Sequence, residues 1–171
     1  MSLRALYIGL LLIAAVALGG RAAPPAVALG RSVTYHAGWN LVGAPDGTRF
    51  AGADGPMFTL QAGDDSYEAL PPGTPATAGF GYWIYFPLAR TVQLEDGAAS
   101  VSLALPAGRW VLVGNPSGTQ SATVRGADAV FAYDPLRGYR PVLSLAPGEG
   151  AWAFSAGGGT LTLAAVGAGG Q

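Results

Sequence analysis

The chain has 171 residues, of which half are hydrophobic, and its nine basic and ten acidic side chains give a net charge of −1. All nine basic residues are Arg, which excludes lysine chemistry such as a P-loop, and so mild a balance predicts no nucleic-acid partner. The absence of cysteine excludes disulfides, thiolate nucleophiles and zinc–thiolate sites, so the fold must depend on its hydrophobic core.

Residues 1–28 have the pattern of a secretory signal peptide. Arg4 gives a basic start, residues 5–18 form an uncharged apolar run, and Ala26-Val27-Ala28 fits a small-residue cleavage site. We therefore expect a signal-peptide helix and a secreted or cell-surface protein. The run is short for a membrane span, which favours a signal peptide. An uncleaved N-terminal anchor is the alternative, and this segment would then be the only membrane contact.

The rest of the chain repeats itself, in residues 31–96 and again in residues 100–163. The stretch from Ala37 to Pro45 matches the stretch from Ala107 to Pro116, and further short motifs recur after both stretches in the same order. All four Trp residues fall at paired positions, Trp39 with Trp110 and Trp83 with Trp152. Such a duplication predicts two related structural units within residues 29–171.

Each unit predicts about six short strands, because aromatic and β-branched runs alternate with the turn residues among the 27 Gly and 13 Pro. In chain order, a first hairpin turns at Ala37-Gly38 in the first unit and at Pro106–Gly108 in the second. A loop follows, at residues 43–55 in the first unit and 114–127 in the second. A second hairpin turns at 63–65 or 134–138, and connections at 70–78 or 145–147 lead to a Trp-bearing strand and a Thr-x-Leu strand. Residues 164–171 are expected to form a flexible tail.

These patterns predict an all-β fold, either a β-sandwich or a closed barrel, made of two pseudo-symmetric repeats that form one domain. No helical period appears after the signal segment. A single unit would leave an apolar face and open strand edges, so we expect the two units to cover each other.

Comparison of the two units predicts which faces of the strands are buried. Trp39 and Leu41 recur as Trp110 and Leu112, and Trp83 and Tyr85 recur as Trp152 and Phe154, so this side is assigned to the core. The opposite side carries Phe80, Tyr82, Ile84 and Phe86 in the first unit but Ala151 and Ala153 in the second. Burial on both sides is the favoured interpretation, and an exposed aromatic platform on the first unit is the alternative.

No residue pattern points to catalysis, a metal or a cofactor. His36 is the only histidine and corresponds to Pro106 in the second unit, which is typical of a solvated turn residue. The acidic pairs Asp64-Asp65 and Glu95-Asp96, with Glu68 near the first, lack the spacing of a calcium loop, and nothing places two carboxylates across a cleft. We therefore expect a protein that is not an enzyme.

The words Gly38-Trp39-Asn40-Leu41 and Gly79-Phe80-Gly81-Tyr82-Trp83-Ile84 resemble the duplicated β-modules of secreted and cell-surface bacterial proteins. The resemblance covers residues 31–163, although the second copy departs from both words. It implies export and an all-β fold but names no ligand.

From export, low charge and an excess of aromatics we expect a non-catalytic binding or adhesion module for a polysaccharide or a cell-envelope protein. Tyr67, Tyr82 and Tyr85 are the predicted ligand-binding residues. A structural subunit of a surface layer or appendage is the alternative, and a secreted hydrolase ranks third.

Overall fold

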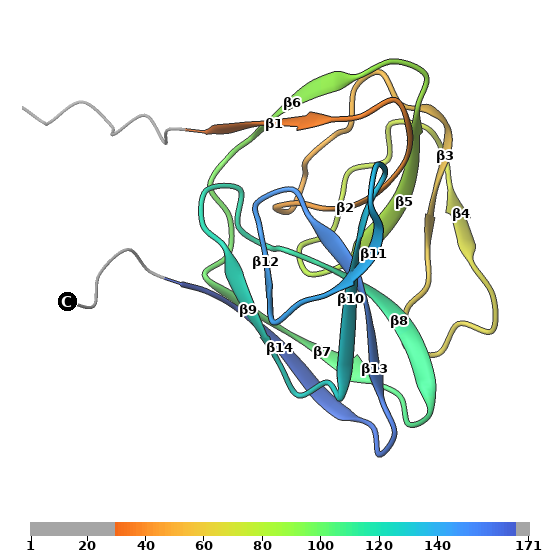
Figure 1. Ribbon diagram of the computed structural model, residues 1–171, viewed down its shortest axis with the longest axis vertical. Helices are drawn as coiled ribbons and strands as arrows, with labels where there is room; N and C mark the ends of the chain where they lie inside the picture. The colour runs from red at the N-terminus through yellow and green to blue at the C-terminus, as the bar shows by residue number, and fades with distance from the viewer. Residues whose placement is uncertain (1–29, 167–171) are drawn as a thin grey trace, which may run out of the picture.

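The computed structural model describes residues 30–166 of the chain. They form an all-β protein of 14 strands, with no helix among them, and accordingly no helix of the length and apolarity that a membrane span needs. The strands make four open antiparallel sheets (Figure 1), so the closed-barrel alternative is wrong for the described residues. The predicted signal-peptide helix lies outside these residues.

The first half of the chain contributes six strands, as the sequence predicts. They are β1 (Arg31–Tyr35), β2 (Gly38–Gly43), β3 (Asp54–Thr59), β4 (Glu68–Leu70), β5 (Gly81–Phe86) and β6 (Arg90–Leu94). The second half contributes eight: β7 (Ser100–Leu105), β8 (Arg109–Gly114), β9 (Ala122–Arg125), β10 (Ala129–Asp134), β11 (Gly138–Pro141), β12 (Ser144–Leu145), β13 (Gly150–Ser155) and β14 (Gly159–Ala165).

Each half contains one four-stranded sheet in which corresponding strands take corresponding places. The first runs β2-β5-β3-β4 and the second runs β8-β13-β10-β11. Their registers also correspond, because Leu41 is opposite Trp83 in the first sheet and Leu112 is opposite Trp152 in the second. The hairpins β3–β4 and β10–β11 turn where expected, at Gly63 (φ 99°) and Gly138 (φ 80°), in a backbone conformation that glycine adopts without strain.

The remaining strands form two further sheets. β1 pairs with β6 alone, whereas β7, β14, β9 and β12 form a four-stranded sheet in the order β12-β9-β14-β7. The two extra strands, β9 and β12, come from segments predicted as a loop and a connection. β14 also continues to Ala165, where it pairs with Ala122, so the strand ends two residues later than predicted and the start of the predicted tail is part of the sheet.

A separate hydrophobic core lies in each half, between its two sheets. In the first half Tyr35, Val92 and Leu94 pack against the inner side of β2 and β5, which carries Val42, Tyr82, Ile84 and Phe86. In the second half Leu161 and Leu163 of β14 pack against Ala151 and Ala153 of β13. The small alanines of β13 are thus matched by bulky leucines from the facing sheet of the same half, not by aromatics of the other half.

The predicted assignment of faces is therefore wrong. Trp39, Trp110 and Tyr85 point outward and are 45%, 39% and 36% exposed, whereas Tyr82 on the other side of β5 is 1% exposed. The alternation of residues groups side chains by face but does not say which face is buried when both are apolar. Leu41 and Leu112 are buried even though they share the outward face with the tryptophans. Leu112 is covered from the first half, because its N–H donates to the carbonyl of Leu60 (2.8 Å).

Backbone contacts join the halves where β2 and β8 end. Gly43 N–H donates to the carbonyl of Gly148 (3.2 Å), and Gly114 N–H donates to the carbonyl of Gly79 (2.8 Å). Isolated bridges pair Val42 with Glu149 and Phe80 with Val113, again in corresponding positions. The two backbone segments at the junction approach so closely that a Cβ on Gly43 would lie 2.3 Å from the Cα of Gly114.

Tyr35 adds a buried side-chain bond to the junction, and it gives a pH-dependent prediction. Its hydroxyl donates to the carbonyl of Gly148 (3.0 Å), and burial raises the pKa of Tyr35 above its usual value. A raised folded-state pKa gives stability that is present below the unfolded-state pKa of about 10 and is lost as pH rises beyond it.

We expect Tyr35→Phe to lower the free energy of unfolding by about 1 kcal/mol at pH 7, because one buried hydrogen bond is lost and the ring contacts remain. The difference in free energy of unfolding between the original protein and the Tyr35→Phe variant should narrow above about pH 10, since only the original protein has a Tyr35 that ionises when it unfolds. Urea denaturation at pH 7 and pH 11 measures both values. A gap that is the same at both pH values would contradict this account.

Candidate functional site

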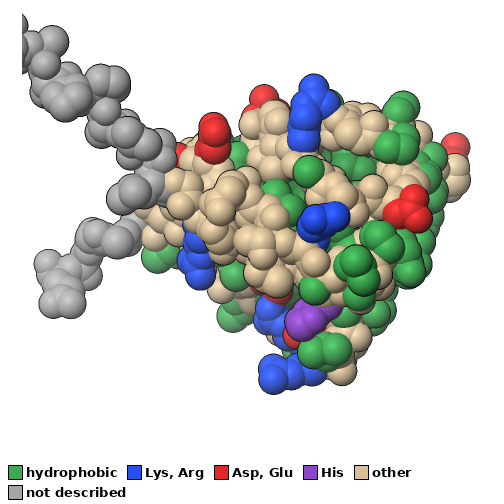
Figure 2. All heavy atoms as spheres, turned by 90° about the horizontal axis from the view of Figure 1, so that it is seen from above, with side chains coloured by type: hydrophobic (Ala, Val, Ile, Leu, Met, Phe, Trp, Pro, Cys, Tyr) green, Lys and Arg blue, Asp and Glu red, His purple; other side chains and the backbone are tan. Residues whose placement is uncertain are grey.

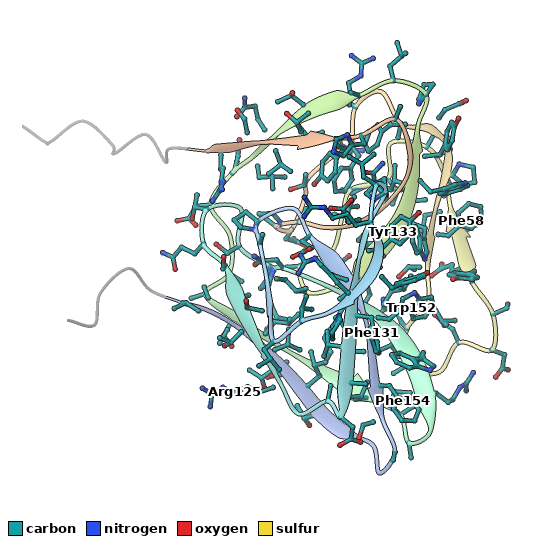
Figure 3. All side chains as sticks on the ribbon, viewed as in Figure 1. Phe58, Arg125, Phe131, Tyr133, Trp152 and Phe154 are labelled. Atoms are coloured by element: carbon teal, nitrogen blue, oxygen red, sulfur yellow. The ribbon has the colours of Figure 1, made fainter. Side chains whose placement is uncertain are left out.

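The outward faces of the two four-stranded sheets carry a connected set of aromatic rings. Ring centroids follow one another at 5.5 Å from Tyr85 to Trp39, 6.0 Å from Trp39 to Phe58 and 6.4 Å from Phe58 to Tyr67. From Tyr67 the series crosses to the second half, with Trp152 at 6.1 Å and Trp110 a further 6.4 Å away. Figure 3 shows Phe58, Trp152 and Phe154 along the side of the molecule away from the start of β1 and the end of β14.

Apart from Tyr85, these rings line two neighbouring hollows. The first hollow has a volume of about 490 Å³ and is lined by Trp39, Phe58, Tyr67, Trp83, Tyr133 and Tyr139. The second hollow has a volume of about 560 Å³ and is lined by Leu60, Arg109, Trp110, Phe131, Tyr139 and Trp152. We call the two together the aromatic groove. All four Trp residues of the chain lie in it, two in each hollow.

The hairpin of each half reaches the sheet of the other half and so builds the walls. The turn after β3 is held against β8, because the side-chain amide of Gln61 donates to the carbonyl of Leu112 (2.8 Å). Arg109 of β8 donates to the backbone carbonyl of Asp64 and pairs with the carboxylate of Asp65 at 3.3 Å. This places Tyr67 of the first half beside Trp152 of the second. In the other direction, Tyr133 of β10 lies 4.9 Å from Trp83 of β5.

The groove is almost uncharged. Among the described residues that line the two hollows, Arg109 is the one charged residue, and its guanidinium already faces Asp65. Arg140, next to Tyr139 in β11, forms an ion pair with Glu149. Hydrophobic side chains gather over the right-hand side of the molecule in Figure 2, with few charged groups between them. Such a surface favours an uncharged ligand, because a charged one would lose hydration without gaining a partner.

Tyrosine hydroxyls supply polar groups to the groove. Partial burial and the neighbouring Tyr139 raise the pKa of Tyr67 above its usual value. The Tyr67 hydroxyl therefore stays protonated throughout the physiological pH range and can both donate and accept a hydrogen bond. The groove thus combines exposed rings with hydroxyls, as sites that bind and orient an organic ligand do.

The structure separates the three tyrosines named from the sequence. Tyr67 lines the first hollow, and Tyr85 packs against Trp39 at its end. Tyr82 points to the other side of β5, where it is buried and its hydroxyl accepts a hydrogen bond from the N–H of Thr77 (2.9 Å). Tyr82 therefore supports the core of the first half and does not reach the groove.

The other candidate residues line neither hollow. His36 is an exposed turn residue whose carbonyl accepts a bond from Asn40. Asp64 accepts from the N–H of Gln61 and Asp96 from that of Gly97, as turn carboxylates do. Within residues 30–166 no group of three or more His, Asp or Glu side chains is placed to hold a metal ion.

No protein-family model, no curated protein and no solved structure matches this chain. The resemblance to duplicated modules of bacterial surface proteins therefore stays a prediction. The groove residues that the sequence reasoning missed are Phe58, Phe131, Tyr133 and Tyr139, together with the four tryptophans assigned to the core. A signal for most of them was present, because aromatic residues recur between the two halves at Phe58 and Phe131, at Tyr67 and Tyr139 and at both Trp pairs, whereas Tyr133 corresponds to Leu60. The inner face of β5 and β13, in contrast, changes from large to small side chains.

Proposed function

We propose that this protein is an exported, non-catalytic binding module that recognises a neutral polysaccharide through the aromatic groove. One observation carries the proposal: exposed and half-buried Trp, Phe and Tyr rings line two adjoining hollows that contain a single charged side chain among the described residues. Large exposed apolar surfaces on monomeric proteins usually mark interaction sites. A sugar ring fits this surface, because it offers a patch of C–H groups to the face of an aromatic ring and hydroxyls to the polar groups beside it.

Two other ligand classes fit the groove less well. Single-stranded nucleic acids also stack on aromatic rings, but they need a positively charged channel, and this groove has one ion-paired Arg. An extended peptide that adds a strand to a sheet needs a free strand edge, whereas the rings here cover the faces of the two sheets.

The proposed architecture and location complete this function. We propose that residues 31–96 and 100–163 are two repeats of one module, which the corresponding strand orders and registers support. Residues 1–28 would direct the chain out of the cytoplasm as a signal peptide or retain it as an anchor. In Figure 1 β1 begins and β14 ends on one side of the molecule, so the groove on the opposite side would face away from any attachment at residue 30.

The test is affinity electrophoresis of the purified protein through gels that contain xylan, glucomannan, β-1,3-glucan, galactan or soluble starch. We expect retardation in at least one gel, and Tyr67→Ala and Trp152→Ala should each weaken binding by at least about tenfold, since a central aromatic contact is worth more than 1.4 kcal/mol. Leu88→Ala is the matched control, because Leu88 is an exposed apolar residue outside both hollows.

A protein that is folded by circular dichroism but retarded by none of these glycans would overturn the proposal. If light scattering of that protein also showed concentration-dependent assembly, the structural-subunit alternative would take its place.

A further inference from the structure

We propose that the two hollows are consecutive subsites for one single glycan chain, which lies across the junction between the halves of the protein. This inference rests on the proposed function and deepens it, because it states how much of the ligand is recognised and in what physical form. The ligand class is a soluble, uncharged polysaccharide bound along its chain, as opposed to a free sugar or a crystalline polysaccharide surface.

The two hollows have corresponding linings. Counted across each sheet from β2 or from β8, the first and second strands each contribute a Trp to the hollow and the third strand contributes a Phe. The residues are Trp39, Phe58 and Trp83 in the first hollow and Trp110, Phe131 and Trp152 in the second. Tyr67 and Tyr139, which occupy corresponding places in the two hairpins, complete the two sites. Two hollows with the same rings are suited to two similar units of a repeating ligand.

The two hollows are also continuous with each other. Tyr139 lines both of them, and Tyr67 of the first hollow lies 6.1 Å from Trp152 of the second. Tyr139 is in turn 5.1 Å from Tyr133. All four of these meeting residues are uncharged aromatics, so a chain that leaves one hollow enters the other over uncharged surface.

The orientation of the rings favours a single chain over a flat crystalline surface. Neighbouring rings are inclined at 53° between Trp39 and Phe58, 79° between Phe58 and Tyr67, and 66° between Tyr67 and Trp152. A flat crystal face can be covered only by rings that are nearly coplanar. Inclined rings instead contact successive units of a chain that twists along the groove.

The linkage between the hollows has a measurable consequence. When two subsites bind parts of one chain, the second contact is intramolecular, and the affinity rises above that of either subsite alone. The tryptophans report on each hollow separately, because Trp39 and Trp83 lie in the first and Trp110 and Trp152 in the second.

The experiment uses oligosaccharides of two and of eight sugar units, cut from the glycan that the protein retains. By calorimetry we expect the eight-unit chain to bind with one chain per protein and at least about tenfold more tightly than the two-unit one. Trp83→Ala and Trp152→Ala should each reduce the affinity for the long chain to that of the short one. Two double variants each keep the tryptophans of one hollow: Trp39→Phe/Trp83→Phe keeps those of the second, and Trp110→Phe/Trp152→Phe keeps those of the first. When each is titrated with the long chain and followed by Trp fluorescence, the two variants should reach half-saturation at the same concentration of the chain.

Several outcomes would overturn the inference while the proposed function stands. They are equal affinity for long and short oligosaccharides, an affinity for the long chain that survives one of the two Trp→Ala changes, or tighter binding to microcrystalline cellulose than to any soluble chain. Binding of a polyproline peptide in the groove in place of every glycan would overturn both proposals, as would the absence of all binding by a folded protein.

Discussion

Gly43→Ala is expected to destabilise the protein by more than about 4 kcal/mol, which is a large part of the stability of a domain of this size, or to prevent it from folding. The reason is the junction between the halves. A Cβ at this position would lie 2.3 Å from the Cα of Gly114, 2.7 Å from the nitrogen of Asn115 and 2.8 Å from the oxygen of Glu149. All three neighbours are backbone atoms, so no side chain can rotate away to make room.

The matched control is Gly157→Ala. A Cβ on Gly157 would meet nothing within 4 Å, and Gly157 is not among the glycines with positive φ, so the change should stay within about 0.5 kcal/mol. Urea denaturation followed by Trp fluorescence measures both variants. A loss of less than about 1 kcal/mol for Gly43→Ala would show that the two strands do not approach as closely as described.

Asn115→Ala is expected to cost about 3 to 5 kcal/mol, even though the corresponding residue in the first half is Ala44. Asn115 is fully buried, and its amide nitrogen donates to the carbonyls of Gln120 and Leu145, both at 2.9 Å. Its amide oxygen accepts from the N–H of Ser117 at 2.8 Å. Removal of the amide would leave these backbone groups without that partner, and two of the three bonds, to Leu145 and Ser117, are buried away from water.

The comparison for this prediction is Thr119→Ala in the same loop, where the hydroxyl donates to Asp96 at 3.1 Å on the exposed surface. Its loss should cost less than about 1 kcal/mol. Chemical denaturation at one pH ranks the two variants. Equal costs would mean that Asn115 does not organise the loop that leads from β8 into β9.

The halves differ in structure at Asn115, where their sequences also diverge. The first half has Ala44 at this place and a loop that leads directly towards β3, whereas the second half has a buried amide that fixes the chain before β9. β9 then pairs with β14, and β12 pairs with β9. The predicted loop at residues 114–127 therefore contains a strand, β9, although its sequence lacks a β-period, because β14 offers a sheet edge with which β9 can pair.

Positions of strands and turns follow well from the sequence, because they depend on local properties. Alternating apolar and polar residues in Val101–Leu105, glycines at the hairpin turns and the Trp-bearing runs each specify a local backbone conformation. The duplicated words of the two halves also end in the same strand order, β2-β5-β3-β4 and β8-β13-β10-β11. The lack of cysteine and lysine in the chain by itself excludes chemistry that needs a thiolate or a lysine side chain, whatever the fold.

Burial and the candidate site were decided by the tertiary structure. Both faces of β5 are apolar, so only the packing of β1 and β6 over Tyr82 and Phe86 determines that this side is the core. Once that side is covered, Trp83 and Tyr85 must face outward. Hairpins from both halves gather Trp83 with Tyr67 and Tyr139 into one groove, and Tyr85 packs against Trp39 at its end. A sequence pattern records which side chains share a face, but which face meets water depends on the sheet that packs against it, and that contact joins residues far apart in the chain.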